Sequence, residues 1–129
     1  MPSDPTNPHD WLIRAYSNLR LAEKGQTQDV MLEDLCFNAQ QATEKALKAV
    51  CLHKKQDFPK THSITRLTDI LAAAGVDVPE QVRTADVLTQ YAVQTPYPGP
   101  VEEITLEEYK ESLAIAARVV FWAEKMISA

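Results

Sequence analysis

The chain has 129 residues, of which 45% are hydrophobic and 24% are charged, so it is long enough for one domain with a hydrophobic core. A formal net charge of −5 excludes a general attraction to nucleic acid, so any basic site must be local. Cys36 and Cys51 fall on one predicted helix, too far apart for a disulfide, and reduced thiols indicate a cytoplasmic protein. No run of about 20 apolar residues predicts a membrane span, and the N-terminus does not resemble a signal peptide.

Prolines and glycines divide the chain into helical segments. Pro2, Pro5 and Pro8 predict an irregular leader over residues 1–8, after which apolar residues recur at helical spacing until Gly25. The expected helices cover residues 8–25, 31–55, 63–75, 79–91 and 105 to the C-terminus, the last opened by a Thr105–Glu108 capping box.

These helices determine the expected fold class. No segment alternates apolar and polar residues as a strand does, and the proline-rich stretch at residues 95–100 excludes regular structure there. The simplest way to bury the apolar stripes is an all-α fold, an up-and-down bundle of four to five helices. No repeat or linker divides the sequence, so residues 1–129 are expected to form a single domain.

Two of the expected helices have apolar residues on more than one face. On the last helix a second apolar stripe lies opposite the one that contains Val120. Either another helix of the same chain covers this second stripe, or it is a subunit interface, and the sequence leaves both open. Because the second helix also has apolar residues opposite its alanine stripe, a homodimer is favoured. The interface candidates are Phe37, Leu52, Ile115, Val119, Trp122 and Met126.

Four segments, in order along the chain, carry a resemblance to a known family. The run CFNAQQATEKALKA at residues 36–49 resembles the signature second helix of HEPN (higher eukaryote and prokaryote nucleotide-binding) domains. Residues 10–12 (DWL) resemble part of the first helix of that family, and residues 61–64 (THSI) resemble the threonine–histidine turn that opens its third. Residues 97–99 (YPG) resemble its arginine–tyrosine–proline loop before the last helix.

The resemblance implies a HEPN four-helix bundle that is commonly dimeric. Such proteins often act as the partner of a minimal nucleotidyltransferase in toxin–antitoxin or related defence systems, and many are metal-independent ribonucleases. The ribonucleases carry an arginine followed four to six residues later by a histidine, and no arginine of this chain has a histidine at that spacing. Pro96 also stands where the family has an arginine before Tyr97. The departures favour a non-catalytic role.

One face of the second helix supplies most of the candidate binding residues. Lys45 and Lys48 project from neighbouring positions and, with Gln41, could hold a phosphate group. The alternative is that Glu44 and Lys48 form an ordinary i,i+4 ion pair on a solvated face. His62 precedes a helix, where it could contact a phosphate or ribose, or instead cap the helix and fix the loop.

The leading hypothesis is a dimeric adaptor that binds nucleotide or RNA and pairs with a minimal nucleotidyltransferase. Tyr97, held between two prolines, either stacks on a base or packs its loop against the bundle. The proposed groove is lined by Gln41, Lys45, Lys48, His62 and Tyr97. The alternatives are a ribonuclease toxin, with His62 as acid or base and Lys48 beside the phosphate, and a purely structural dimerising bundle. No catalytic residue is assigned in the leading hypothesis, because the arginine–histidine spacing of the ribonucleases is absent. No metal ion is assigned, because the histidines lack metal-ligand spacing, and no cofactor is assigned.

Overall fold

The computed structural model describes residues 4–25, 27, 29–93 and 103–128, most of which lie in helices and none of which forms a strand. The elements are α1 (Pro8–Lys24), α2 (Leu32–His53), α3 (Ile64–Ala73), α4 (Glu80–Arg83), the 3₁₀ helix η1 (Thr84–Tyr91) and α5 (Leu106–Ser128). The predicted all-α fold is confirmed. Within the described ranges no helix has the length and apolar character needed to cross a membrane. Tyr97, a predicted site residue, lies outside these ranges.

The helix ends follow the local chemistry of the sequence. Asn7 caps α1 by accepting the His9 backbone N–H, and Ser63 caps α3. The predicted capping box of α5 is present, because the Thr105 hydroxyl accepts the Glu108 N–H at 3.1 Å while the Glu108 carboxylate accepts the Thr105 N–H at 3.3 Å. These side chains satisfy backbone N–H groups that have no partner within their helices.

Residues 79–91 differ from the single helical piece that the sequence predicts. The chain forms one α-turn, α4, and then continues as the 3₁₀ helix η1. Val82, Ala85 and Leu88 are all fully buried, at a spacing of three residues. A 3₁₀ helix has three residues per turn, so Ala85 and Leu88 lie on one face of η1, three residues apart as Ala85 is from Val82 at the end of α4. Burial of that face accounts for the tighter winding.

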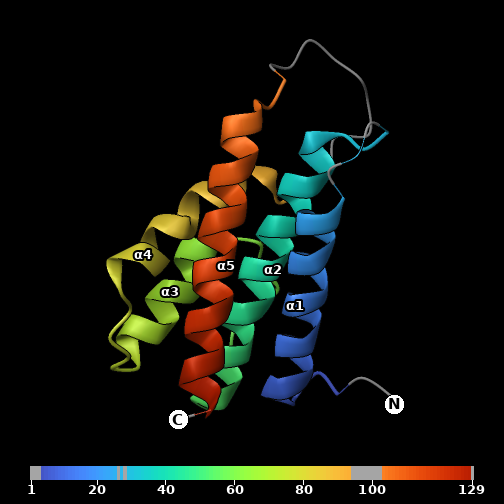
Figure 1. Ribbon diagram of the computed structural model, residues 1–129. Helices are drawn as coiled ribbons and strands as arrows, with labels where there is room; N and C mark the ends of the chain where they lie inside the picture. The colour runs from blue at the N-terminus through green and yellow to red at the C-terminus, as the bar shows by residue number, and fades with distance from the viewer. Residues whose placement is uncertain (1–3, 26, 28, 94–102, 129) are drawn as a thin grey trace.

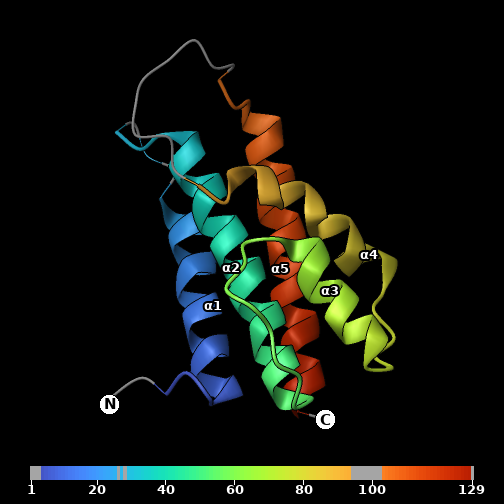
Figure 2. The same cartoon turned by 180° about the vertical axis from the view of Figure 1, so that it is seen from behind.

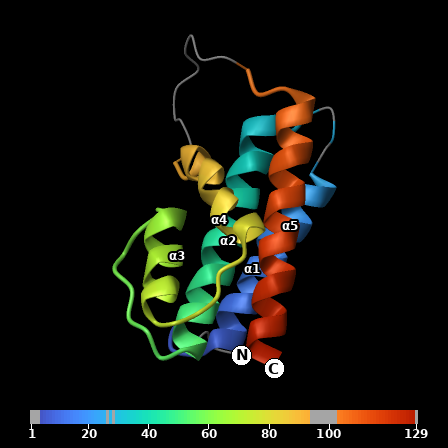
Figure 3. The ribbon, with the colours of Figure 1, turned by 90° about the vertical axis from the view of Figure 1, so that its left-hand side faces the viewer.

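Three long helices form the body of the bundle. Figure 1 shows α1, α2 and α5 side by side, with both ends of the chain at the same end of the bundle. The short elements α3, α4 and η1 cover the remaining side, as the view in Figure 3 shows. α2 contacts α1, α5, α3 and η1 and is the central helix. Its fully buried residues Ala39, Ala42, Ala46 and Ala49 permit close approach on several sides at once.

The connection between α2 and α3 has a topological consequence for the site. Residues 54–63 run along α2 in the opposite direction before α3 begins, so α2 and α3 run in the same direction (Figure 2). The turn that starts this return includes Lys55, whose backbone φ is 57°. The return brings the end of the connection, including His62, against the middle of α2.

The structure answers part of the question left open about the apolar stripes. Ile115 and Val119 are buried within the chain, where α2, α4 and η1 all contact α5. For these two residues the same chain therefore provides the cover. The remaining interface candidates, Phe37, Leu52, Trp122 and Met126, are half-buried. The homodimer remains a prediction.

Candidate functional site

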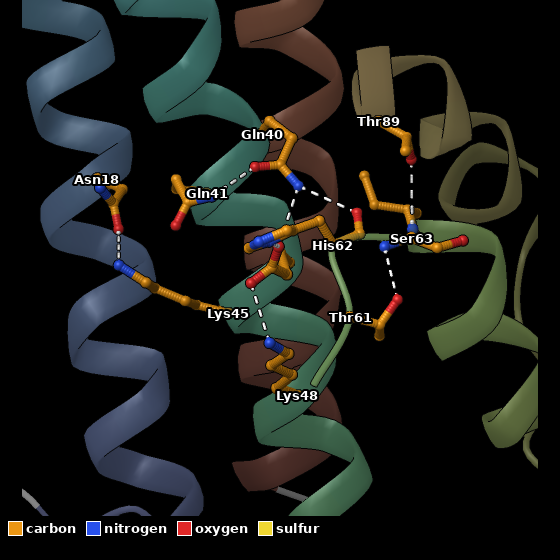
Figure 4. A network of polar contacts seen from close by, with 11 residues as sticks. Asn18, Gln40, Gln41, Lys45, Lys48, Thr61, His62, Ser63 and Thr89 are labelled. Carbon is orange, nitrogen blue, oxygen red and sulfur yellow. Dashed lines mark hydrogen bonds and ion pairs between the residues drawn. The ribbon is translucent and has the colours of Figure 1, made fainter. Parts of the chain in front are cut away.

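A buried carboxylate, that of Glu44, is the centre of a polar network on α2. Glu44 is only 3% exposed and accepts three hydrogen bonds. The donors are Gln40 Nε2 at 3.2 Å, Lys48 Nζ at 3.0 Å and His62 Nδ1 at 2.8 Å. Figure 4 shows Gln40, Lys48 and His62 gathered over this stretch of α2, between α1 and α3. A carboxylate that leaves water needs such partners, and Glu44 obtains them from its own helix and from the returning connection.

These partners keep Glu44 ionised. Burial alone would raise the pKa of the Glu44 carboxyl, but the hydrogen bonds from His62 and Lys48, together with the Lys48 charge, lower it below its ordinary value. At neutral pH the network therefore contains a buried negative charge next to a buried ammonium.

His62 is held by its backbone and by one ring nitrogen. Gln40 Nε2 also donates to the His62 carbonyl oxygen at 3.3 Å, and Thr61 Oγ1 accepts the Ser63 N–H at 3.0 Å. The His62 side chain is nevertheless 61% exposed. With Nδ1 donating to an ionised carboxylate, Nε2 is the nitrogen left to accept a proton or contact a ligand. A carboxylate-oriented imidazole of this kind is suited to acid–base chemistry.

Lys48 is occupied within the fold. Its side chain is buried, and its ammonium lies 5.6 Å from the ring centroids of both Trp11 and Phe58. The two rings meet edge to face at 6.1 Å, so together they enclose the lysine. The i,i+4 pair with Glu44 weighed as the alternative is present, but it is buried rather than solvated. Lys48 is therefore poorly placed to hold a phosphate.

Lys45 points the other way, toward α1 (Figure 4). Its ammonium donates to Asn18 Oδ1 at 2.7 Å, and Asn18 in turn donates to Asn38 at 2.9 Å. Burial is the largest cause that lowers the pKa of Lys45, and the positive charges of Arg14 and Lys48 add to it, although Glu44 offsets part of this. A bound anion would relieve that electrostatic cost.

A pocket of about 420 Å³ opens beside Lys45, where α1 meets the residues that precede it. Trp11 forms part of its wall, and the indole N–H donates to the Pro5 carbonyl at 2.8 Å, which fixes the leader against the helix. The lining residues are Asp4, Pro5, Asp10, Trp11, Arg14 and Lys45. Two cations and an aromatic ring thus share one concave surface.

The structure brings some of the predicted site residues together and separates others. Gln41 is half-buried and donates to Gln40 Oε1 at 2.7 Å, beside the Glu44 network. Lys45 belongs to the pocket instead, and Lys48 is enclosed. The sequence interpretation thus merged two neighbouring sites into one groove.

Sequence reasoning missed the contribution of α1. Trp11, Arg14 and Asn18 follow one another at spacings of three and four residues, so they lie along one face of the helix. That face meets Lys45, and the mixture of an aromatic, a cation and an amide on it was the available signal. Gln40 was not predicted as a site residue for a different reason: it lies in an alanine-rich stripe, whose residues are expected to belong to the hydrophobic core.

Comparison with known proteins identifies the fold and its family. A family model described as the HEPN domain matches residues 8–126. The chain belongs to the HEPN family. The resemblance noted in the sequence is therefore confirmed over nearly the whole chain.

Two solved structures share this HEPN fold. TT1696 from Thermus thermophilus is 35% identical with a TM-score of 0.76, over 92% of this chain and 97% of that one. ST0689, described as an archaeal HEPN homologue, is 22% identical with a TM-score of 0.72, over 94% of this chain and 98% of that one. No curated protein matches the chain.

Other chemistries find little support in this HEPN chain. Burial raises the pKa of the Cys51 thiol to about 11, so it is not a nucleophile at neutral pH. Among the described residues there is no cluster of three or more histidine, cysteine or carboxylate side chains able to hold a metal ion.

Proposed function

We propose that this HEPN protein is a non-catalytic, nucleotide-binding adaptor that pairs with a minimal nucleotidyltransferase in a toxin–antitoxin or defence-type system. The observation that carries the proposal is the pocket of about 420 Å³ that Lys45 and Arg14 share with Trp11. Small-molecule pockets commonly measure about 300–1,000 Å³ and combine an apolar wall with a few polar groups. This pocket has that composition.

The chemistry of the lining suits a nucleotide. Arginine offers a planar set of N–H donors to phosphate oxygens, and lysine adds a point charge. An indole ring is a good aromatic platform for a base, and stacking on aromatic side chains contributes about 1–3 kcal/mol per base. Since Asn18 already fixes the Lys45 ammonium at 2.7 Å, little side-chain entropy remains to be lost on binding.

Two things support the adaptor role: membership of the HEPN family, and exposed apolar side chains on the surface of the bundle. Ile13, Leu21 and Phe121 are exposed apolar side chains on α1 and α5. Phe121 also contacts the Tyr16 ring, at a centroid distance of 6.3 Å. Exposed apolar side chains on neighbouring helices support a role in protein contacts, first of all in the homodimer.

Thermal unfolding with and without nucleotide tests this function. Millimolar ATP or GTP should raise the melting temperature of the wild-type chain, because a ligand that binds only the folded state stabilises it. Lys45→Ala should lose most of the rise, whereas Lys110→Ala, an exposed lysine on α5, should keep it. Identical melting curves with and without nucleotide would overturn the nucleotide-binding function.

The pairing of Glu44 with His62 favours a second function, a ribonuclease with a non-standard site. Nε2 of His62 would take a proton from a ribose 2′-hydroxyl group, while the Glu44 carboxylate, 2.8 Å from Nδ1, stabilises the imidazolium. Incubation with short RNA, analysed by length, distinguishes the two functions. Cleavage that disappears in His62→Ala would make the protein an enzyme, and intact RNA would leave the adaptor.

A further inference from the structure

Two carboxylates line the same pocket as the two cations, and they bear on which nucleotide it takes. Asp10 lies in the first turn of α1, and Asp4 lies in the segment that folds back over that turn. Carboxylates would weaken a pocket that bound phosphate alone, because they repel phosphate oxygens. Acceptor groups of this kind instead match hydrogen-bond donors on a ligand.

Local hydrogen bonds fix both carboxylates. The Asp4 backbone N–H donates to Asp10 Oδ2 at 2.7 Å, while the Thr6 backbone N–H and hydroxyl donate to Asp4 Oδ1 at 2.9 and 2.6 Å. Among the described residues, Asp10 Oδ1 and Asp4 Oδ2 accept no hydrogen bond. Each carboxylate oxygen can accept two hydrogen bonds, so Asp10 has acceptor sites left for a ligand.

The nucleobases differ in what they offer to a carboxylate. Guanine presents two adjacent donors, N1–H and the N2 amino group, which a carboxylate can accept with its two oxygens at once. Adenine and cytosine present an amino group next to a ring nitrogen that is itself an acceptor, so the second carboxylate oxygen meets a lone pair. Such a mismatch leaves polar groups unpaired where the ligand covers them, and binding sites discriminate between ligands on that basis.

We propose that the pocket is selective for guanine nucleotides, with the base edge on Asp10, the ring against Trp11 and the phosphate on Lys45 and Arg14. The inference rests on the proposed function, because the phosphate end of the pocket is the same. Its new content is the base preference and the role of Asp10. The volume of about 420 Å³ suits a single nucleotide.

Calorimetric titration of the full chain with GMP, IMP and AMP tests the preference. IMP keeps N1–H but lacks the N2 amino group, so the expected order of affinity is GMP, then IMP, then AMP. We expect at least about a tenfold difference between GMP and AMP.

Two variants separate the base end from the phosphate end. Asp10→Asn retains an oxygen for the Asp4 N–H but replaces one acceptor by a donor, so it should weaken GMP binding and remove or reverse the preference. Lys45→Ala should weaken GMP and AMP by the same factor. Should Asp10→Asn lower the melting temperature strongly, Asp4→Asn provides a second test of the same preference.

The outcomes distinguish the two proposals. Equal affinities for GMP and AMP, both weakened in Lys45→Ala, would overturn guanine selectivity and leave the nucleotide-binding function standing. A preference for GMP that survives in both Asp10→Asn and Asp4→Asn would overturn the role of these carboxylates. The absence of binding by any of the three nucleotides would overturn both proposals.

Discussion

At the scale of single residues, the buried carboxylate of Glu44 needs a buried counter-charge to be stable. Lys48, which is 8% exposed, is its only buried ionic partner among the described residues. Glu44→Gln would leave that ammonium without a counter-charge and should cost about 3 kcal/mol of unfolding free energy. Urea denaturation measures this, and Glu111→Gln on the exposed face of α5 is the control, with an expected change within about 0.5 kcal/mol. Similar losses in the two variants would show that the Glu44 charge does not stabilise Lys48.

The same carboxyl makes stability depend on pH. The ordinary pKa of Glu44 is 4.5 and its value in the folded chain is lower, so the unfolded chain binds more protons as the solution is acidified through this range. The stabilising contribution is thus fully present above pH 4.5 and is lost as the pH falls through the folded value. The difference in stability between wild type and Glu44→Gln should shrink below pH 4.5 in a series of urea titrations. A constant difference across that range would mean that Glu44 does not titrate there.

Residue identities alone predicted the geometry of this region in part. Lys45, Lys48 and His62 were expected near one another on the second helix and the turn before the third, because helical spacing fixes which residues share a face. Spacing does not determine which neighbour covers that face. The burial of Lys48 depends on Phe58, which reaches it only because the connection after α2 turns back along the helix.

At the scale of elements, the packing of the end of α1 against Leu35 of α2 depends on Gly25. A Cβ atom there would overlap Leu35 Cδ2 and lie 2.8 Å from the Leu21 carbonyl oxygen, and the latter is backbone that cannot move aside without distorting α1. Gly25→Ala should therefore destabilise the protein by about 1–3 kcal/mol. Thermal melts check this against Lys24→Ala, a neighbour on the same helix end, which should change stability by less than about 0.5 kcal/mol. Equal melting temperatures for the two variants would show that the space around Gly25 accommodates a methyl group.

Helix boundaries followed from sequence because their signals are local. The proline at the start of α1, the glycine after it and the Thr105–Glu108 box act within a few residues. The 3₁₀ winding of η1 and the return of residues 54–63 depend instead on what packs against them. Such tertiary effects override propensity and are not contained in any short window of sequence.

At the scale of the whole molecule, the proposed homodimer requires a surface that a partner covers. On α5, Phe121 is 47% exposed beside the half-buried Trp122. Phe121→Glu should convert a dimer into monomers by light scattering, because a charge in an apolar contact is expensive to bury. Val87→Glu is the matched control, since Val87 is also 47% exposed but lies on η1. If Phe121→Glu keeps the dimeric mass, this surface is not the interface.

The proposed nucleotide site lies beside Trp11, and the two tryptophans of the chain allow a direct test of it. In a ¹⁵N-labelled sample each tryptophan gives one indole N–H signal, and Trp122→Phe assigns them. Titration with GMP should shift the Trp11 signal, whose N–H bonds the Pro5 carbonyl at the pocket, and leave the Trp122 signal on α5 in place. If GMP at saturating concentration moves only the Trp122 signal, or neither, the pocket is not the nucleotide site.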